Sequence, residues 1–219
     1  MSTVYVELCQ IVAEAEARGI AVVVIGAFAV RAYLVRPDRR VTQDIDVLVR
    51  EEDLAQLREV LESRGYRLYP LGPWWRAERG AGADRSVVDV AIGAVVDVGS
   101  FEAYPLDPGE ASRRAEPNGV MLPVPCAEDV VALKLLAHRD KDALDLIALM
   151  RDLGAIDAAV LTRRIEARDL EIPIRRGYLE IAAAAESGEL LRLWARRSSD
   201  PLSEDELAKA LARLHGLLR

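Results

Sequence analysis

The sequence predicts an α+β protein: a mixed sheet with flanking helices, followed by a C-terminal helical bundle. In the first half, short β-branched runs alternate with amphipathic segments, whereas periodic leucines and alanines fill the second half. Pro125 lies where the pattern changes. We therefore expect one domain at residues 1–125 and a helical domain at residues 126–219.

The first half alternates helix and strand signals. Apolar residues recur at helical spacing over residues 4–18 and Gly19 suits a C-cap. A buried strand at 21–25 is followed by Gly26, and Pro37 should end the next helix. The predicted segments are helices at 27–34 and 51–63 and strands at 21–25 and 45–49.

A β-meander is expected next, because strand-like runs at 66–69, 74–78 and 86–90 are separated by turns. The pattern beyond Gly99 is irregular until a strand at 120–124, whose prolines indicate an edge or a terminus. Everything after it is helical, with helices expected at 128–138, 141–152, 156–168, 173–185 and 203–218.

The composition excludes several classes of protein. A net charge of -7 argues against coating nucleic acid by bulk electrostatics, although arginines cluster locally, where a solvated face is the simpler explanation. Cys9 and Cys126 are isolated, so neither a disulfide framework nor a thiolate zinc site is expected. The longest apolar run is too short to span a bilayer, and no basic-then-apolar leader is seen at the N-terminus. We expect a cytoplasmic protein with no membrane partner.

Two aspartates, Asp44 and Asp46, begin the predicted strand at 45–49. Residues two apart on a strand point the same way, so both carboxylates can reach one divalent ion. Two like charges held together favour either solvent exposure or a bound cation. In isolation the pattern is more often a loop cap beside a solvent-facing acid.

Gly26 stands between a buried strand and a helix. Such a junction presents backbone N–H groups and a positive helix end to an anion such as a phosphate. A tight packing turn is the more frequent explanation of a lone glycine there.

Asp89 is an acidic residue within an apolar strand, where aspartate is disfavoured. If its strand neighbours that of Asp44 and Asp46, three carboxylates converge and suit two magnesium ions. Asp97 competes for this role, but Asp89 is preferred because its segment follows a glycine turn.

In combination, this order of strand, Gly26, helix, Thr42–Val47 with its paired aspartates, and Asp89 resembles the polymerase-β-like nucleotidyltransferase superfamily. The stretch from Glu128 to Leu146 is similar to the lysine-bearing helix and Arg-x-Lys-Asp-x-x-Asp run of bacterial abortive-infection-type nucleotidyltransferase toxins. The resemblance covers about residues 20–150. Ala27 departs from it, since serine or glycine is usual after the first glycine, and a hydroxyl contact to the triphosphate is lost.

The resemblance implies that Asp44, Asp46 and Asp89 are the catalytic and metal-binding residues, with two Mg²⁺ ions as cofactor and Mn²⁺ as an alternative. It further implies nucleotide binding by the residues Gly26, Ala27, Lys134, Arg139, Asp142 and Asp145. Taken alone, a helical lysine such as Lys134 is usually a snorkelling surface residue. Asp142 and Asp145 either orient Lys134 and Arg139 or pair locally, as Lys141 with Asp145.

The implied function is transfer of a nucleoside monophosphate from an NTP donor to an acceptor hydroxyl. The toxin resemblance suggests RNA such as a tRNA end as the acceptor and a cognate antitoxin as partner, with small molecules and protein hydroxyls as alternative acceptors. The alternative is a weak or inactive protein of the same fold that acts as an interaction module or an antitoxin. Three intact carboxylates favour the enzyme, and Ala27 favours the alternative slightly.

Overall fold

A computed structural model describes residues 3–35, 42–115, 121–153 and 156–219. Pro37, Val120 and the arginine cluster of Arg36, Arg39 and Arg40 lie outside these ranges. The chain divides into two compact units, one formed by Met1–Ala32 with Thr42–Pro125 and the other by Tyr33–Val41 with Cys126–Arg219.

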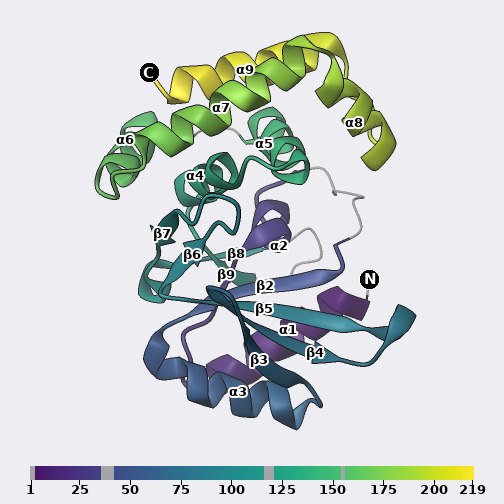
Figure 1. Cartoon of the computed structure of the whole chain (residues 1–219), viewed down its shortest axis with the longest axis vertical. Helices are drawn as coiled ribbons and strands as arrows, with labels where there is room; N and C mark the ends of the chain where they lie inside the picture. Colours follow the sequence, from purple (N-terminus) through teal and green to yellow (C-terminus); the bar gives the residue numbers. More distant parts are fainter. Residues whose placement is uncertain (1–2, 36–41, 116–120, 154–155) are drawn as a thin grey trace. The chain divides into compact units, whose positions relative to one another are not determined.

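The first unit is built on a mixed sheet with the strand order β1-β2-β5-β4-β3, extended from β5 through β6 to β7 (Figure 1). β2 and β5 are parallel, and the other neighbours are antiparallel. The strands are β1 (Val23–Val24), β2 (Asp44–Val49), β3 (Arg67–Leu71), β4 (Trp74–Arg79), β5 (Ser86–Ile92), β6 (Ala94–Val96) and β7 (Ala103–Pro105). A separate hairpin-like pair joins β8 (Ser112–Ala115) to β9 (Met121–Val124).

The sheet of the first unit has one apolar face, and its other face is polar around Asp44 and Asp46 and apolar at the buried Leu48 and Ala91. Ile45, Val47 and Val49 of β2 alternate with Asp44 and Asp46, as the period of two requires. The helices of this unit are α1 (Thr3–Ala17), α2 (Gly26–Arg31) and α3 (Leu54–Ser63). Arg58 of α3 lies over the ring of Trp75, so α3 covers the face to which Trp75 points. The carboxylates point to the opposite face, where α2 begins.

The second unit is entirely helical within the residues described. Its helices are α4 (Ala127–Ala137), α5 (Asp140–Asp152), α6 (Ala158–Glu166), α7 (Glu171–Glu186), α8 (Glu189–Arg197) and α9 (Glu204–Leu217). Leucines at helical spacing form the core, including the fully buried Leu135, Leu149 and Leu161. Among the described residues no helix combines the length and the apolar character needed to cross a bilayer. The predicted α+β class is confirmed.

The structure contains elements that the sequence patterns did not indicate. The three-residue strand β7 and the four-residue β8 fall beyond Gly99, where the sequence appeared irregular, and the three-residue β6 lies just before Gly99, where no strand was predicted. Their pairing is set by neighbouring strands, because runs of this length show no periodicity. Helix α8 was also missed, although it buries Leu190, Leu193 and Trp194. Conversely, α2 ends at Arg31 rather than at residue 34.

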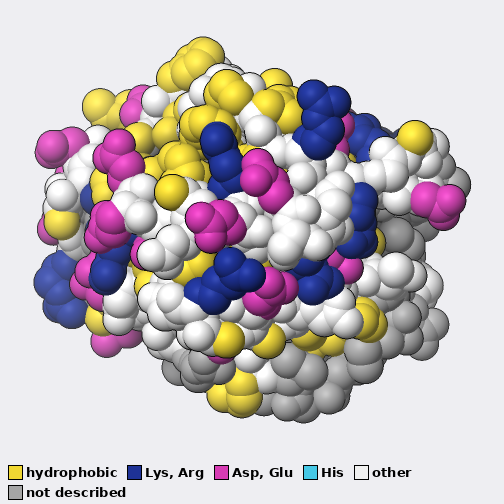
Figure 2. Space-filling view, turned by 90° about the horizontal axis from the view of Figure 1, so that it is seen from below, with side chains coloured by type: hydrophobic (Ala, Val, Ile, Leu, Met, Phe, Trp, Pro, Cys, Tyr) yellow, Lys and Arg dark blue, Asp and Glu magenta, His cyan; other side chains and the backbone are white. Residues whose placement is uncertain are grey.

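Surface charge is mixed on the face seen from below in Figure 1. Figure 2 shows that basic and acidic side chains of the described residues are interspersed there and do not gather by sign. In the second unit, Arg164 is paired at 3.0 Å with Asp129, whose side chain is buried. The interspersed charges favour a charge-balanced surface over a basic stripe for nucleic acid.

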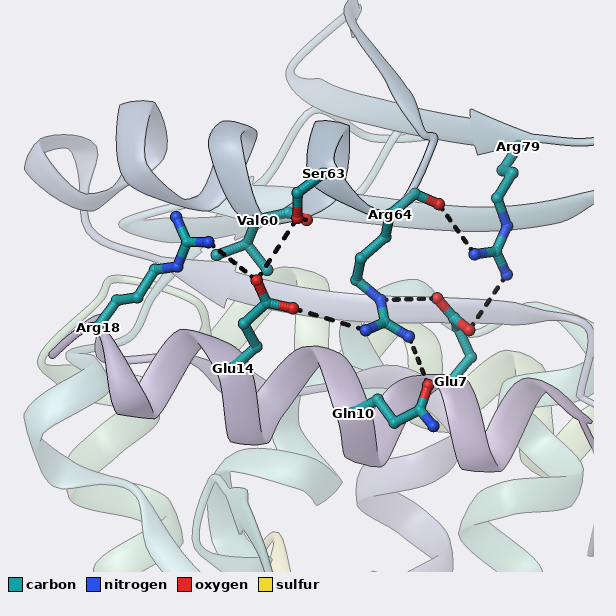
Figure 3. A network of polar contacts seen from close by, with 8 residues as sticks. All are labelled: Glu7, Gln10, Glu14, Arg18, Val60, Ser63, Arg64 and Arg79. Atoms are coloured by element: carbon teal, nitrogen blue, oxygen red, sulfur yellow. Dashed lines mark hydrogen bonds and ion pairs between the residues drawn. The ribbon is translucent and has the colours of Figure 1, made fainter.

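Glu7 holds the apolar-face elements of the first unit together (Figure 3). Its carboxylate accepts from Arg64, just after α3, at 3.0 Å and pairs with Arg79 of β4 at 3.1 Å, while its side chain is 10% exposed. Arg79 also donates to the backbone carbonyl of Arg64. Burial alone raises the pKa of the Glu7 carboxyl, but the hydrogen bonds from the two arginines outweigh burial and lower this pKa.

We expect Glu7→Gln to reduce the free energy of unfolding by about 1–3 kcal/mol at neutral pH, because two partly buried arginines lose their shared acceptor. A carboxyl whose pKa is lowered in the folded state stabilises the fold at pH values above its unfolded-state pKa, which is about 4.3. That contribution disappears as the pH falls through the folded-state pKa. Urea unfolding followed by circular dichroism should therefore show the difference between wild type and variant shrinking in acid.

Glu14→Gln is the matched control, because Glu14 lies two helical turns along α1 and contacts the same Arg64 at a longer 3.5 Å. Its side chain is 30% exposed, so its loss should cost less than about 1 kcal/mol. Equal effects of the two variants, or a Glu7→Gln deficit that does not change with pH, would contradict this account.

Candidate active site

The paired aspartates lie at the start of β2. Asp44 is exposed and Asp46 is half-buried, and both point to the same side of the strand because they alternate with the buried Ile45 and Val47. The buried half of β2 fixes this strand at the centre of the sheet. The two carboxylates are therefore held by a rigid element rather than by a loop.

Asp89 lies beside Asp46 on the neighbouring strand. β2 and β5 run parallel, with Asp44 opposite Val87 and Asp46 opposite Asp89. Paired residues of adjacent strands are roughly 4.8 Å apart and share a face. The expectation that the strand of Asp89 neighbours that of Asp44 and Asp46 is confirmed.

Asp97, the competing candidate, has a different setting. It follows β6, and its Oδ2 accepts hydrogen bonds from the backbone N–H groups of Gly99 and Ser100 and from the Ser100 hydroxyl. These bonds form a local turn. β5, which carries Asp89, is the strand that pairs with β2, so the register favours Asp89.

Arg76 is the residue of this face that the sequence patterns did not single out. It lies opposite Asp89 on β4. Its Nε donates to Asp89 Oδ1 at 2.7 Å and its Nη2 to Asp89 Oδ2 at 2.8 Å. The hydrogen bond to Asp89 raises the pKa of Arg76 against the effect of burial, and the charge of Asp44 adds to the rise. The predicted antiparallel meander is the signal that could have shown this, because aligning its strands residue by residue places Arg76 opposite Asp89.

Gly26 is required by the position of Asp46. It has φ +65° at the start of α2, and an added Cβ would lie 2.1 Å from Asp46 Oδ2. The N–H of the preceding Ile25 donates to the Asp46 carbonyl at 2.9 Å. The strand–glycine–helix junction therefore serves the close approach of the Asp46 carboxylate. Ala27 follows on α2, and its methyl group has no donor to offer a phosphate.

The donor set suits a hard divalent cation. Asp44, Asp46 and Asp89 offer carboxylate oxygens, the ligands that Mg²⁺ prefers, and they lie on one face at adjacent positions. Within the described ranges no group of three His, Cys, Asp or Glu side chains is already gathered closely enough to enclose an ion. The residues fit the ion in type and register, and in this structure both oxygens of Asp89 accept from Arg76.

The predicted nucleotide-binding residues of the second unit form a buried ion network. Lys134 Nζ lies 2.7 Å from Asp142 Oδ1 and 2.7 Å from Asp145 Oδ2. Asp142 Oδ2 also accepts from Arg139 Nε at 2.6 Å. Asp142 thus contacts both Lys134 and Arg139, and Asp145 contacts Lys134.

Lys134 is not the snorkelling surface residue that its helix alone suggested, because its side chain is only 8% exposed. Burial lowers the pKa of Lys134, but the charges of Asp145 and Asp142 outweigh burial and raise it. The pKa of the Asp142 carboxyl is lowered by Lys134 and Arg139 in spite of burial. Arg139, with a side chain 51% exposed, is the member that reaches solvent.

The model of a family described as uncharacterised nucleotidyltransferase matches residues 2–182. No curated protein is significantly similar to the chain.

Solved structures share the fold at low identity. The antibiotic-resistance factor ANT(2'')-Ia in solution is 22% identical with a TM-score of 0.52, covering 86% of this chain and 98% of that chain. ANT(2'')-Ia in complex with adenylyl-2''-tobramycin is 20% identical with a TM-score of 0.50, covering 82% and 99%. JHP933 from Helicobacter pylori is 12% identical with a TM-score of 0.52, covering 97% and 89%.

The family model confirms the expected nucleotidyltransferase family, and the solved structures share the fold. With its family model spanning residues 2–182, the chain belongs to this nucleotidyltransferase family and is a nucleotidyltransferase.

Proposed function

We propose that this enzyme transfers a nucleoside monophosphate from an NTP to an acceptor hydroxyl, with Asp44, Asp46 and Asp89 as its catalytic carboxylates. The observation that carries the proposal is the parallel register of β2 and β5, which places Asp46 opposite Asp89. A bound Mg²⁺ or Mn²⁺ pair would neutralise the triphosphate and the departing pyrophosphate. Asp44 and Asp46 are the residues that would hold it, and Asp89 would complete the site.

Asp89 is proposed to accept the proton of the acceptor hydroxyl on one of its carboxylate oxygens. The acceptor oxygen then bonds to the α-phosphorus as the bond from that phosphorus to the pyrophosphate oxygen breaks. Phosphoryl-group transfer depends mainly on position and charge, which a carboxylate on a central strand provides.

In the second unit, we infer that Arg139 is the group that contacts the nucleotide. Lys134 is buried between Asp142 and Asp145, so it is poorly suited to act as a mobile charge on a triphosphate. It can act indirectly, because Asp142 binds both Lys134 and Arg139. Asp142 and Asp145 then serve the nucleotide site by holding these two cations.

Two classes of acceptor are proposed for test. RNA, such as a tRNA end, is the acceptor implied by the resemblance to abortive-infection toxins, which also implies a cognate antitoxin. A cationic small molecule is supported by the net charge of -7, which attracts cations. The structural neighbour bound to adenylyl-2''-tobramycin supports the same class.

Wild-type protein incubated with Mg²⁺ and each α-labelled NTP should label either purified tRNA or tobramycin, as measured by gel and thin-layer analysis. We expect Asp46→Asn to lower transfer at least about a hundredfold, because one group that positions and neutralises charge is lost. Asp84→Asn, which removes the same charge from an exposed turn residue, should leave transfer unchanged.

Full activity of Asp46→Asn would remove the aspartates from the mechanism. Absence of transfer to any acceptor, with no nucleotide binding by calorimetry, would favour the alternative of an interaction module or antitoxin.

Gly26→Ala should lose transfer as severely as Asp46→Asn, because the new Cβ would lie 2.1 Å from the Asp46 carboxylate. Its backbone, at φ +65°, should also cost about 1–2 kcal/mol of stability. Gly93→Ala separates the two effects, since Gly93 has φ +64° and nothing within 4 Å of an added Cβ. Gly93→Ala should be destabilised yet active, and an active Gly26→Ala enzyme would show that Asp46 need not hold its present position.

A further inference from the structure

We propose that Arg76 is a resident counter-cation of Asp89 which a divalent ion must displace, so that Arg76 sets the affinity of the site for metal. The proposal rests on the proposed function, since it concerns the same carboxylates. Its direction is specific: removal of Arg76 strengthens metal binding rather than weakening it.

Geometry is the first support. Arg76 uses Nε and Nη2 to contact both oxygens of Asp89, at 2.7 and 2.8 Å. Such a bidentate pair is among the strongest side-chain contacts. The Asp89 side chain is 14% exposed and that of Arg76 is 29% exposed, so water screens the pair only partly.

The sheet register is the second support. Asp46, Asp89, Arg76 and Tyr69 are successive cross-strand partners on β2, β5, β4 and β3, so they form one row on one face. Arg76 is the basic member of this row, and it sits next to the carboxylate that lies beside Asp46. The charge that would repel the two neighbouring aspartates is thus compensated from within the sheet.

Competition follows from charge. The Arg76 guanidinium does not lose its proton at any ordinary pH, so it can give up Asp89 only by moving away. A divalent ion and Arg76 that share one carboxylate repel each other. A metal that draws Asp89 toward Asp44 and Asp46 therefore works against the Arg76 contact, and this agrees with the absence of a gathered group of three ligands among the described residues.

The test is binding of Mn²⁺ alone, without nucleotide, measured by calorimetry and by the loss of the free-ion signal in electron paramagnetic resonance. Arg76→Gln should bind Mn²⁺ at least about tenfold more tightly than wild type, because a full positive charge next to the ligands is removed. Arg76→Lys keeps the positive charge but cannot form the bidentate contact, so its Mn²⁺ affinity should lie between those of wild type and Arg76→Gln.

Arg67→Gln is the matched control. Arg67 lies opposite Glu78 on the edge strand β3 and shares the face of Arg76 without contacting Asp89. The Arg67→Gln substitution removes the same charge and should leave the Mn²⁺ affinity unchanged.

A double variant tests whether Arg76 acts through Asp89. In the Asp89→Asn background, adding Arg76→Gln should no longer increase the Mn²⁺ affinity.

Unchanged or weaker Mn²⁺ binding by Arg76→Gln, in a folded protein whose wild type binds the ion, overturns the proposal and makes Arg76 a positioning residue. If Arg76→Gln and Arg67→Gln increase the Mn²⁺ affinity equally, the proposal is overturned as well, because the effect would then come from the net charge of the protein. If neither wild type nor Arg76→Gln binds Mn²⁺, the metal-dependent function itself fails along with the inference. Thermal unfolding of each variant with and without Mn²⁺ gives an independent readout, as an ion bound to the folded state raises the melting temperature.

Discussion

The parallel pairing of β2 with β5 is the constraint on which the site depends. It places Asp46 opposite Asp89 at the centre of the sheet, where neither strand can shift without exposing its apolar face. A shift of one residue would turn Ile45 and Val88 toward the polar face and bury the aspartates. The hydrophobic core of the first unit therefore enforces a like-charge contact that the side chains themselves oppose.

The two faces of this sheet treat buried charge in opposite ways. On the apolar face, Glu7 has two arginines within 3.1 Å, so its single charge is fully compensated and its role is structural. On the polar face, Arg76 pairs with Asp89, and Asp44 and Asp46 lie on the neighbouring strand β2. Carboxylates grouped on rigid strands are costly unless cations or a ligand complete them. This grouping of acids on one face distinguishes the candidate site from the cluster around Glu7.

The carboxylates and the fold class could be predicted because their signals are local. Asp44 and Asp46 interrupt a buried strand at a period of two, and Asp89 is an acid within an apolar run. Arg76 gave no such signal, because an arginine on a strand of mixed polarity is usually solvated. Its role depends on a cross-strand partner thirteen residues away. Strands β6 and β7 were missed for the same reason, since their pairing partners and not their own residues define them.

Burial limits the role that Lys134 of the second unit can have. A lysine that neutralises a triphosphate must move, yet Lys134 is held by two carboxylates within 2.7 Å. Removing one partner would leave a buried charge uncompensated, so the network is retained as a whole or not at all. Its positive and negative members balance, with Arg139 at the exposed end. The sequence run that resembles a nucleotide-binding motif thus encodes a charge-balanced cluster, and Arg139 is the member whose side chain is half-exposed.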